Sequence, residues 1–313
     1  MSPSLTRVAC IGECMIELSE LGDGRLSRTH GGDTLNTAVY LARLGVEVDY
    51  VTALGDDHFS DEMLAGWRRE GVGTALVPRL RGRLPGLYLI RRDASGERSF
   101  FYWRDRAPAR ELFDLPETPA ISDALAGFGL LYFSGITLSL YGEAGRERLF
   151  QALERTVACG GRIAFDTNFR PRGWPDRAVA QAAYRRAIDL ADFVLASTED
   201  LELLFGAEYS AAVLPRADAA EVVLKLPQPA CRLLAPGVDV VVEAAPVSEV
   251  VDTTAAGDSF AAAYLAGRLT GADPSAAARA GHALAGTVVR YPGAIIPAAA
   301  MPSCVDLGKP GER

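Results

Sequence analysis

The chain has 313 residues, of which 49% are apolar and 23% are charged, and its formal charge is −8. This composition is that of an ordinary globular protein, which excludes collagen-like, coiled-coil and wholly disordered chains. No apolar run is long enough to span a bilayer, no secretion signal is recognisable, and the negative charge argues against general nucleic-acid binding. We therefore expect a cytoplasmic protein without nucleic-acid or membrane partners, whose five cysteines stay reduced.

Short apolar strands and glycine-terminated helices make up the first third of the chain. The predicted elements are strands at 7–11 and 48–54, helices at 36–44 and 60–70, and a hairpin of strands 86–92 and 98–104 around a turn at 93–97. Gly45 and Gly71 directly follow the two helical patterns, as expected at helix C-termini. The hairpin strands have charged ends and aromatic residues, which predicts a sheet that is not fully buried.

From residue 129 onward, strands and helices alternate along the chain. The expected strands are 130–133, 163–166, 193–196, 222–226 and 238–243, and the expected helices are 143–159, 177–191, 201–205, 255–269 and 274–290. This alternation indicates an α/β protein with a parallel sheet covered by helices on both faces, with strand 238–243 open to antiparallel pairing. The polar segment 303–313 is expected to be a flexible tail.

Polar segments follow two of these strands and precede one helix, at 166–168, 197–200 and 252–258. Because ligands of parallel α/β sheets bind outside the carboxyl ends of the strands, these segments predict the site. The sequence contains no P-loop, protein-kinase, dinucleotide-binding, nucleophile-elbow or zinc-protease signature. These absences exclude the corresponding enzyme classes and make a protein-bound transition metal a poor prediction.

The segment DTTAAGDSF at 252–260 carries the strongest signal. Its small residues lead directly into a helix, so that backbone N–H groups are accessible at the helix start, where phosphate binds well. Asp258 lies in the first helical turn, and a carboxylate there can accept a proton from a hydroxyl group. Helix capping by small residues chosen for packing explains the same pattern, and the residues alone leave both interpretations open.

A second segment, GGDTLNTA at 31–38, opens another helix. Its paired glycines allow close backbone approach, and Asp33 and Asn36 offer hydrogen bonds to a polyol. The alternative is an ordinary loop with an N-cap residue. Both interpretations again remain open.

The segments GGDTLNTAVYLARLG and DTTAAGDSF resemble the two signatures of the ribokinase-like (PfkB) carbohydrate kinases, in the same order and separation. The likeness extends from about residue 8 to residue 302. Five further segments look like those of the family members that phosphorylate 2-keto-3-deoxygluconate: IGECMIELS, RLPGLY, SGERSFFYWR, DTNFRPRGW and YPGAIIP.

The resemblance implies a single ribokinase-like domain over residues 1–313. Its fold would be a doubly wound, mostly parallel sheet with helices on both faces, plus a small β-sheet lid built from about 13–28 and 86–104. In many relatives the lids of two subunits pack together, which implies a homo-oligomer, a dimer or larger. The implied reaction is ATP-dependent phosphorylation of 2-keto-3-deoxy-D-gluconate at its terminal hydroxyl. The alternatives are another sugar kinase of the fructokinase or ribokinase type, or an inactive sugar-binding protein on the same fold.

The resemblance also implies roles for individual residues. The catalytic base would be Asp258, and the anion hole would be formed by Ala255, Ala256 and Gly257. The residues implied to meet the sugar are Gly32, Asp33, Thr34, Leu35, Asn36, Tyr88, Tyr102, Arg104 and Arg170. The two tyrosines have a second interpretation, in which they only pack the lid hairpin.

The nucleotide and ion sites are implied in the same way. The residues implied to lie near ATP are Asn168, Ser197, Lys225, Gly257 and His282, although a lone histidine on a helix is also compatible with a structural role. Asp252 and Thr254 would help hold a monovalent cation such as K⁺. Mg²⁺ would be held mainly by phosphates and water, with Asp200 contributing through a water molecule. Asp200 follows Ser197 where relatives often carry Asn-x-x-Glu, so its carboxylate is on a shorter arm.

Overall fold

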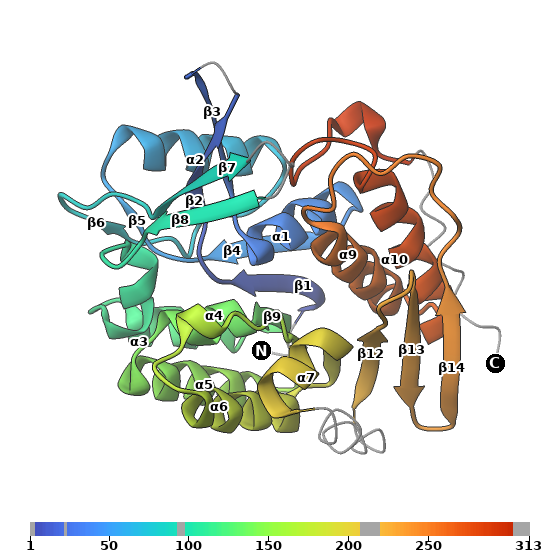
Figure 1. Ribbon diagram of the computed structural model, residues 1–313. Helices are drawn as coiled ribbons and strands as arrows, with labels where there is room; N and C mark the ends of the chain where they lie inside the picture. Colours follow the sequence, from blue (N-terminus) through green and yellow to red (C-terminus); the bar gives the residue numbers. More distant parts are fainter. Residues whose placement is uncertain (1–3, 22–23, 93–97, 207–219, 303–313) are drawn as a thin grey trace.

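The computed structural model describes residues 4–21, 24–92, 98–206 and 220–302, so the expected turn at 93–97 and tail at 303–313 lie outside the described residues. Its main feature is an eight-stranded sheet with the order β14-β13-β12-β11-β10-β9-β1-β4 (Figure 1). The strands are β1 (Ser4–Ile11), β4 (Glu47–Val51), β9 (Phe128–Ser134), β10 (Arg162–Asp166), β11 (Phe193–Ser197), β12 (Glu221–Lys225), β13 (Ala230–Ala235) and β14 (Val238–Glu243). The pairs from β4 through β12 are parallel, and β13 and β14 add antiparallel pairs at one edge.

The predicted alternation is confirmed, but strand β13 and helix α4 (Gly135–Leu140) were not predicted. Strand β13 was missed because a short element at the edge of a sheet has weak periodicity of its own. Two prolines, at 227 and 229, lie in the tight connection between β12 and β13, where Leu226 N donates to Ala230 O at 3.0 Å. Strand β14 pairs with β13 in the antiparallel direction, which the sequence had left open.

Helices cover both faces of the large sheet (Figure 1). One face carries α1 (Asp33–Arg43), α2 (His58–Arg69), α9 (Ala256–Leu269) and α10 (Pro274–Val288). The other face carries η1 (Pro108–Asp114), α3 (Thr118–Leu125), α4 (Gly135–Leu140), α5 (Glu143–Ala158), α6 (Arg177–Leu190) and α7 (Thr198–Phe205). Successive residues of β1 alternate between the two cores, with Val8 and Cys10 on one side and Ala9 and Ile11 on the other, all fully buried. This is why the central strands read as continuous apolar runs.

A second, four-stranded sheet has the order β3-β2-β7-β8. Its strands are β2 (Met15–Glu20), β3 (Leu26–Gly31), β7 (Leu87–Arg92) and β8 (Arg98–Trp103). Large side chains of β8 remain exposed, from 40% at Phe100 to 60% at Trp103. This small sheet occupies the segments expected to form a lid, and its closing over a ligand stays a prediction.

The remaining elements are short. They are β5 (Leu54–Gly55), β6 (Arg79–Leu80), η2 (Pro171–Gly173) and η3 (Ala298–Ala300). Helix α4 was not predicted; it begins with a capping box between Ser134 and Thr137 directly after β9. Within the described residues, no helix has the length and apolar character needed to cross a membrane.

Candidate active site

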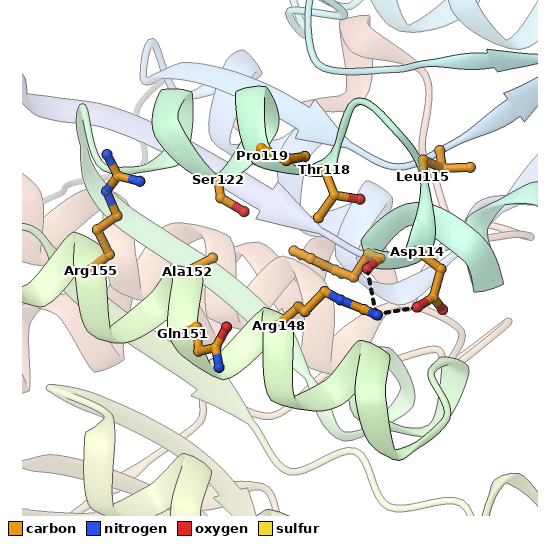
Figure 2. A pocket seen from close by; sticks show the side chains of 10 residues that line it. Asp114, Leu115, Thr118, Pro119, Ser122, Arg148, Gln151, Ala152 and Arg155 are labelled. Atoms are coloured by element: carbon orange, nitrogen blue, oxygen red, sulfur yellow. Dashed lines mark hydrogen bonds and ion pairs between the residues drawn. The ribbon is translucent and has the colours of Figure 1, made fainter.

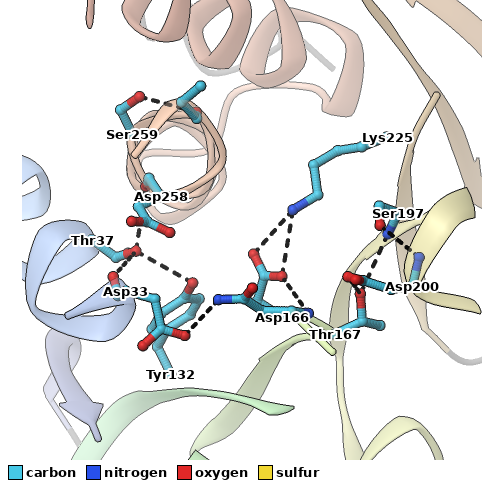
Figure 3. Close-up of polar contacts among 12 residues, drawn as sticks. Asp33, Thr37, Tyr132, Asp166, Thr167, Ser197, Asp200, Lys225, Asp258 and Ser259 are labelled. Carbon is cyan, nitrogen blue, oxygen red and sulfur yellow. Dashed lines mark hydrogen bonds and ion pairs between the residues drawn. The ribbon is translucent and has the colours of Figure 1, made fainter. Parts of the chain in front are cut away.

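The polar segments predicted from the sequence meet at the carboxyl ends of three neighbouring strands. Asp166 ends β10, Ser197 ends β11 and Lys225 ends β12. The first turns of α1 and α9 lie beside them, so that Asp33 and Asp258 approach the same region (Figure 3). This placement follows from the parallel sheet, in which the carboxyl ends of all parallel strands lie at the same edge.

Asp258 is held by a residue from the other signature segment. Asn36 Nδ2 donates a hydrogen bond to Asp258 Oδ2 at 2.8 Å, and Thr37 Oγ1 donates to the Asp258 carbonyl at 3.3 Å. Burial, and then the nearby charge of Asp33, raises the pKa of Asp258 to about 8, while the Asn36 hydrogen bond and Lys225 oppose the shift. A carboxylate with this pKa exchanges its proton near neutral pH, as a general base must.

The start of α9 presents backbone N–H groups beside a cation, Lys225 at the end of β12. Ala255, its N-cap residue, has φ 60°, and within the described chain the other non-glycine residue with positive φ is Asn168, at 26°. Strained backbone of this kind clusters at functional sites. A Cβ added at Gly257 would lie 3.5 Å from Lys225 Nζ, so the amine faces the helix start. Because the first N–H groups of a helix have no acceptor within it, this arrangement suits an anion.

Lys225 also contacts a buried carboxylate. Its Nζ lies 3.2 Å from Asp166 Oδ2, and the Asp166 side chain is 5% exposed. Burial lowers the pKa of Lys225, but the carboxylates of Asp166 and Asp200 outweigh it and raise the pKa overall. The amine is therefore a fixed positive charge between the strand ends and α9.

Only some of the residues in the first turn of α1 that were predicted to meet the sugar have side chains that face the site. Asp33 Oδ2 accepts a hydrogen bond from Asn168 Nδ2 at 2.8 Å, which links the first turn of α1 to the segment after β10. Thr34 and Leu35 are buried, at 0% and 1% exposed, and Thr34 Oγ1 is 3.2 Å from Tyr50 Oη. Their side chains face the core, so any ligand contact there involves the backbone.

The small sheet places two predicted tyrosines side by side. Tyr88 and Tyr102 are paired across β7 and β8, with ring centroids 6.0 Å apart, and Tyr88 Oη donates to the Glu17 carboxylate. Arg104 follows β8, and its guanidinium is 6.0 Å from the Tyr102 ring centroid. These side chains form one polar and aromatic surface at the base of the small sheet.

Arg170 has a more exposed side chain than Arg104. Its side chain is 61% exposed, its Nη1 donates to the Phe169 carbonyl at 2.9 Å, and it lies 3.8 Å from Asp200 Oδ1. The Asp200 carboxylate in turn accepts a hydrogen bond from Thr167 Oγ1 at 2.7 Å. Arg170 is therefore a loosely held cation at the edge of the site.

His282 and Asp252 have structural partners. His282 Nε2 is 3.1 Å from the Val242 carbonyl, and its ring meets the edge of Phe260. The Asp252 carboxylate accepts hydrogen bonds from Thr254 and from Gly293 N, which joins the loop before α9 to the loop after α10.

Among the described residues, no group of three or more His, Cys, Asp or Glu side chains is arranged to hold a metal ion.

Two acidic residues of the site were missed from the sequence. Glu17 accepts the Tyr88 hydroxyl hydrogen bond, and Glu13 pairs with Arg104 while its side chain is 1% exposed. A signal was present, because Glu13 interrupts the apolar stretch ACIGECMI, and a carboxylate in such surroundings needs a buried partner.

A cavity of about 430 Å³ lies elsewhere, between η1, α3 and α5 (Figure 2). Arg148 and Arg155 line it, but they are paired with Asp114 and Asp123 respectively. The cavity is on the face of the sheet opposite α9 and contains none of the predicted site residues.

The comparisons with known proteins agree with this geometry. The pattern of the pfkB family carbohydrate kinases matches residues 5–301. The chain is 46% identical over 306 residues to the 2-dehydro-3-deoxygluconokinase of Dickeya dadantii, covering 95% of this chain and 98% of the relative, and 45% identical over 307 residues to that of Escherichia coli K12, covering 95% and 99%.

Solved structures agree on the fold. A fructokinase with bound ATP from Xylella fastidiosa superimposes with a TM-score of 0.82 at 26% identity, over 95% of each chain. The 2-dehydro-3-deoxygluconokinase of Thermotoga maritima superimposes with a TM-score of 0.80 at 26% identity, over 93% of this chain and 96% of that one. The ribokinase-like fold predicted from the sequence is thus confirmed, and the chain belongs to the pfkB family of carbohydrate kinases.

Proposed function

We propose that this protein transfers a phosphoryl group from ATP to the terminal hydroxyl of 2-keto-3-deoxy-D-gluconate. The observation that carries the proposal is the Asp258 carboxylate at the start of α9, held by Asn36 and with a pKa raised to about 8. The acidic sugar is supported by the 46% identity to a 2-dehydro-3-deoxygluconokinase.

Asp258 is the general base in this proposal. It takes the proton of the sugar hydroxyl as that oxygen attacks the phosphoryl group. The N–H groups of Ala255 and Gly257, together with the Lys225 amine, stabilise the charge that develops on the phosphoryl oxygens. The Ala256 N–H group donates to the Thr253 carbonyl at 3.2 Å in the structure and would join them once that hydrogen bond opens. Asn36 orients the carboxylate so that one oxygen remains available to the hydroxyl.

The opposite end of the sugar carries a carboxylate and meets the small sheet. Arg104 is the main partner in this proposal, with Tyr88 and Tyr102 packing against the sugar chain. A guanidinium suits the task because it can donate two parallel hydrogen bonds to a carboxylate. Arg170 contributes from the sheet edge.

The nucleotide binds across the strand ends near Asn168, Ser197 and Lys225. When bound, ATP would supply the phosphoryl group and Mg²⁺ would offset the charge of its phosphates, and Asp200 would be the protein group that contacts the ion through water. Asp252 holds the loop before α9 in place, and a K⁺ ion near Asp252 and Thr254 supports the same loop.

Assembly through the small sheet is a further part of the proposal. Side chains alternate along a strand, so Phe101 and Trp103 of β8 lie on the face opposite Tyr88 and Tyr102. They are 45% and 60% exposed, which is unusual for a surface that stays in water. Packing of this face against that of a second copy in a homo-oligomer would cover them.

A coupled assay of ADP release tests the function. The substrates are ketodeoxygluconate, its galacto epimer, fructose and ribose, each with ATP and Mg²⁺. We expect kcat/KM to be highest for ketodeoxygluconate or its epimer. Faster turnover of fructose or ribose would assign the protein to another branch of the family, and no turnover of any sugar would indicate a binding protein.

A further inference from the structure

Glu13 is a buried carboxylate at the junction of the two sheets. It lies between the end of β1 and the start of β2, and its Oε2 accepts a hydrogen bond from Arg104 Nη2. The Glu13 side chain is 1% exposed and that of Arg104 is 20% exposed. Because ionised side chains are rarely buried so completely without a partner, the two residues depend on each other.

The backbone around the pair leaves it little freedom. A Cβ added at Gly86 would lie 2.8 Å from Glu13 Oε1 and 3.2 Å from Arg104 Cβ. A Cβ added at Gly32 would lie 2.1 Å from the Glu13 carbonyl oxygen. Glu13 is therefore fixed between the small sheet and the first turn of α1, the helix whose Asn36 holds Asp258.

Polar atoms of the pair remain without partners in the described part of the chain. Glu13 Oε1 and Arg104 Nε are buried and make no hydrogen bond there. Buried polar atoms of this kind are rare, and each calls for a partner such as a water molecule, an ion or a bound ligand.

Charged groups of both signs act on Glu13. Burial raises the pKa of Glu13, the guanidinium groups of Arg104 and Arg110 lower it, and the Asp33 carboxylate raises it. The two arginines thus balance the two carboxylates when all four groups are ionised. The sugar acid of the proposed reaction carries one negative charge at the end that meets this surface.

We propose that Glu13 is a positioning residue, which grips the Arg104 guanidinium so that its other N–H groups are held toward the carboxylate of the sugar acid. The inference rests on the proposed function, because it assumes an acidic sugar. A guanidinium carries five N–H donors in a fixed plane, so it can bind one carboxylate of the protein and one of the substrate at the same time.

A double-mutant cycle tests this role. We expect Glu13→Gln to raise the KM for ketodeoxygluconate by about tenfold, because charge-assisted hydrogen bonds are roughly twice as strong as neutral ones, while kcat and the KM for ATP change less than about twofold. In the Arg104→Ala background, Glu13→Gln should have no further effect, since residues that act through one another are not additive.

The matched control is Glu111→Gln. Glu111, in η1, likewise forms an ion pair with an arginine, Arg83, but it lies outside the proposed site. We expect this variant to leave both KM values unchanged. If Glu13→Gln does not fold, Glu13→Asp keeps the charge on a shorter arm and should still raise the sugar-acid KM alone.

Several results would overturn the inference. Unchanged sugar-acid KM in Glu13→Gln or Glu13→Asp would do so, as would additive effects in the cycle. A lowered KM would also do so, because it would mean that Glu13 only repels the substrate. If the wild-type protein releases no ADP with ketodeoxygluconate, the proposed function fails and this inference falls with it. If the wild type is active and the cycle is additive, the inference alone fails.

Discussion

The large sheet and the small sheet present opposite environments to the site. In the large sheet, residues 8–11 of β1 are fully buried between two layers of helices. In the small sheet, the aromatic side chains of β8 are 40–60% exposed. The proposed base is therefore mounted on the closely packed part of the molecule, and the groups for the far end of the sugar on the part with an open face.

The difference implies that the large sheet carries the groups for catalysis and the small sheet those for substrate selection. Chemistry needs a fixed geometry, which a packed helix start supplies, whereas substrate selection can use a surface that closes on the ligand. Changes on the large sheet should mainly alter kcat, and changes on the small sheet should mainly alter the KM for the sugar. Substitutions on either sheet can test that split.

Asp258→Asn should lower kcat by about 10²–10⁴-fold, because asparagine cannot accept the proton of the hydroxyl group. The KM values for sugar and ATP should change little, since the carboxylate acts mainly in the transition state. Steady-state kinetics of the purified variant measure this. A variant with nearly full kcat would remove Asp258 from the mechanism.

The pH dependence should report the same carboxylate. Its pKa is raised to about 8, and the base works only when ionised, so kcat/KM for the sugar should fall about tenfold per pH unit below that value. The stability of the folded protein should depend on pH in the opposite direction to its activity. Because the folded-state pKa lies above the unfolded one, the contribution of Asp258 is greatest at low pH and is lost as pH rises through about 8.

Thermal unfolding measures the stability half of that prediction. Asp258→Asn should raise the melting temperature relative to wild type at pH 9, and this difference should shrink toward pH 5. A difference that does not vary with pH would mean that the Asp258 pKa is close to that of an ordinary carboxyl.

Substitution of Arg104 and of Arg170 should raise the KM for the sugar acid by different amounts. A hydrogen bond to a charged group is worth about 1.5–3 kcal/mol, so Arg104→Ala should raise the KM for ketodeoxygluconate by roughly 10–150-fold. Arg170→Ala should have a smaller effect, because its side chain is 61% exposed and water screens its charge. The penalties should shrink for a neutral ketose. Equal losses for charged and neutral sugars would contradict the carboxylate assignment.

A change of monovalent ion should have a more moderate effect. If a cation near Asp252 and Thr254 supports the loop before α9, activity should be several-fold higher in K⁺ than in Na⁺ at constant ionic strength. Assays in K⁺, Na⁺ and a bulky organic cation measure this. Equal rates in all three would argue against the ion site.

The smallest expected effect on activity concerns the exposed face of the small sheet. Trp103→Ser should leave the unfolding of the large sheet unchanged, because the side chain is 60% exposed. If small sheets of two copies pack together, the variant should have a lower mass in light scattering than the wild type. An identical mass for both proteins would place the interface elsewhere.

Local sequence patterns predicted the elements of the large sheet well. The helix expected at 255–269 was found as α9 from Ala256 to Leu269, because small residues at its start and an apolar face are local signals. Strand β13 and helix α3 were missed, since short elements at a sheet edge or between longer helices have weak periodicity of their own. Their formation depends on neighbours that become adjacent only in the fold.

The sequence by itself determined the family, the alternating α/β order and the two signature segments that carry Asp258 and Asn36. Only the tertiary structure decided which side chains meet. Asn36 reaches Asp258 across 222 positions, and Glu13 reaches Arg104 across 91. Such contacts depend on the order of the strands and on the burial they produce, which periodicity along the chain does not encode. The same holds for the raised pKa of Asp258, which arises from burial and from the Asp33 carboxylate of another helix.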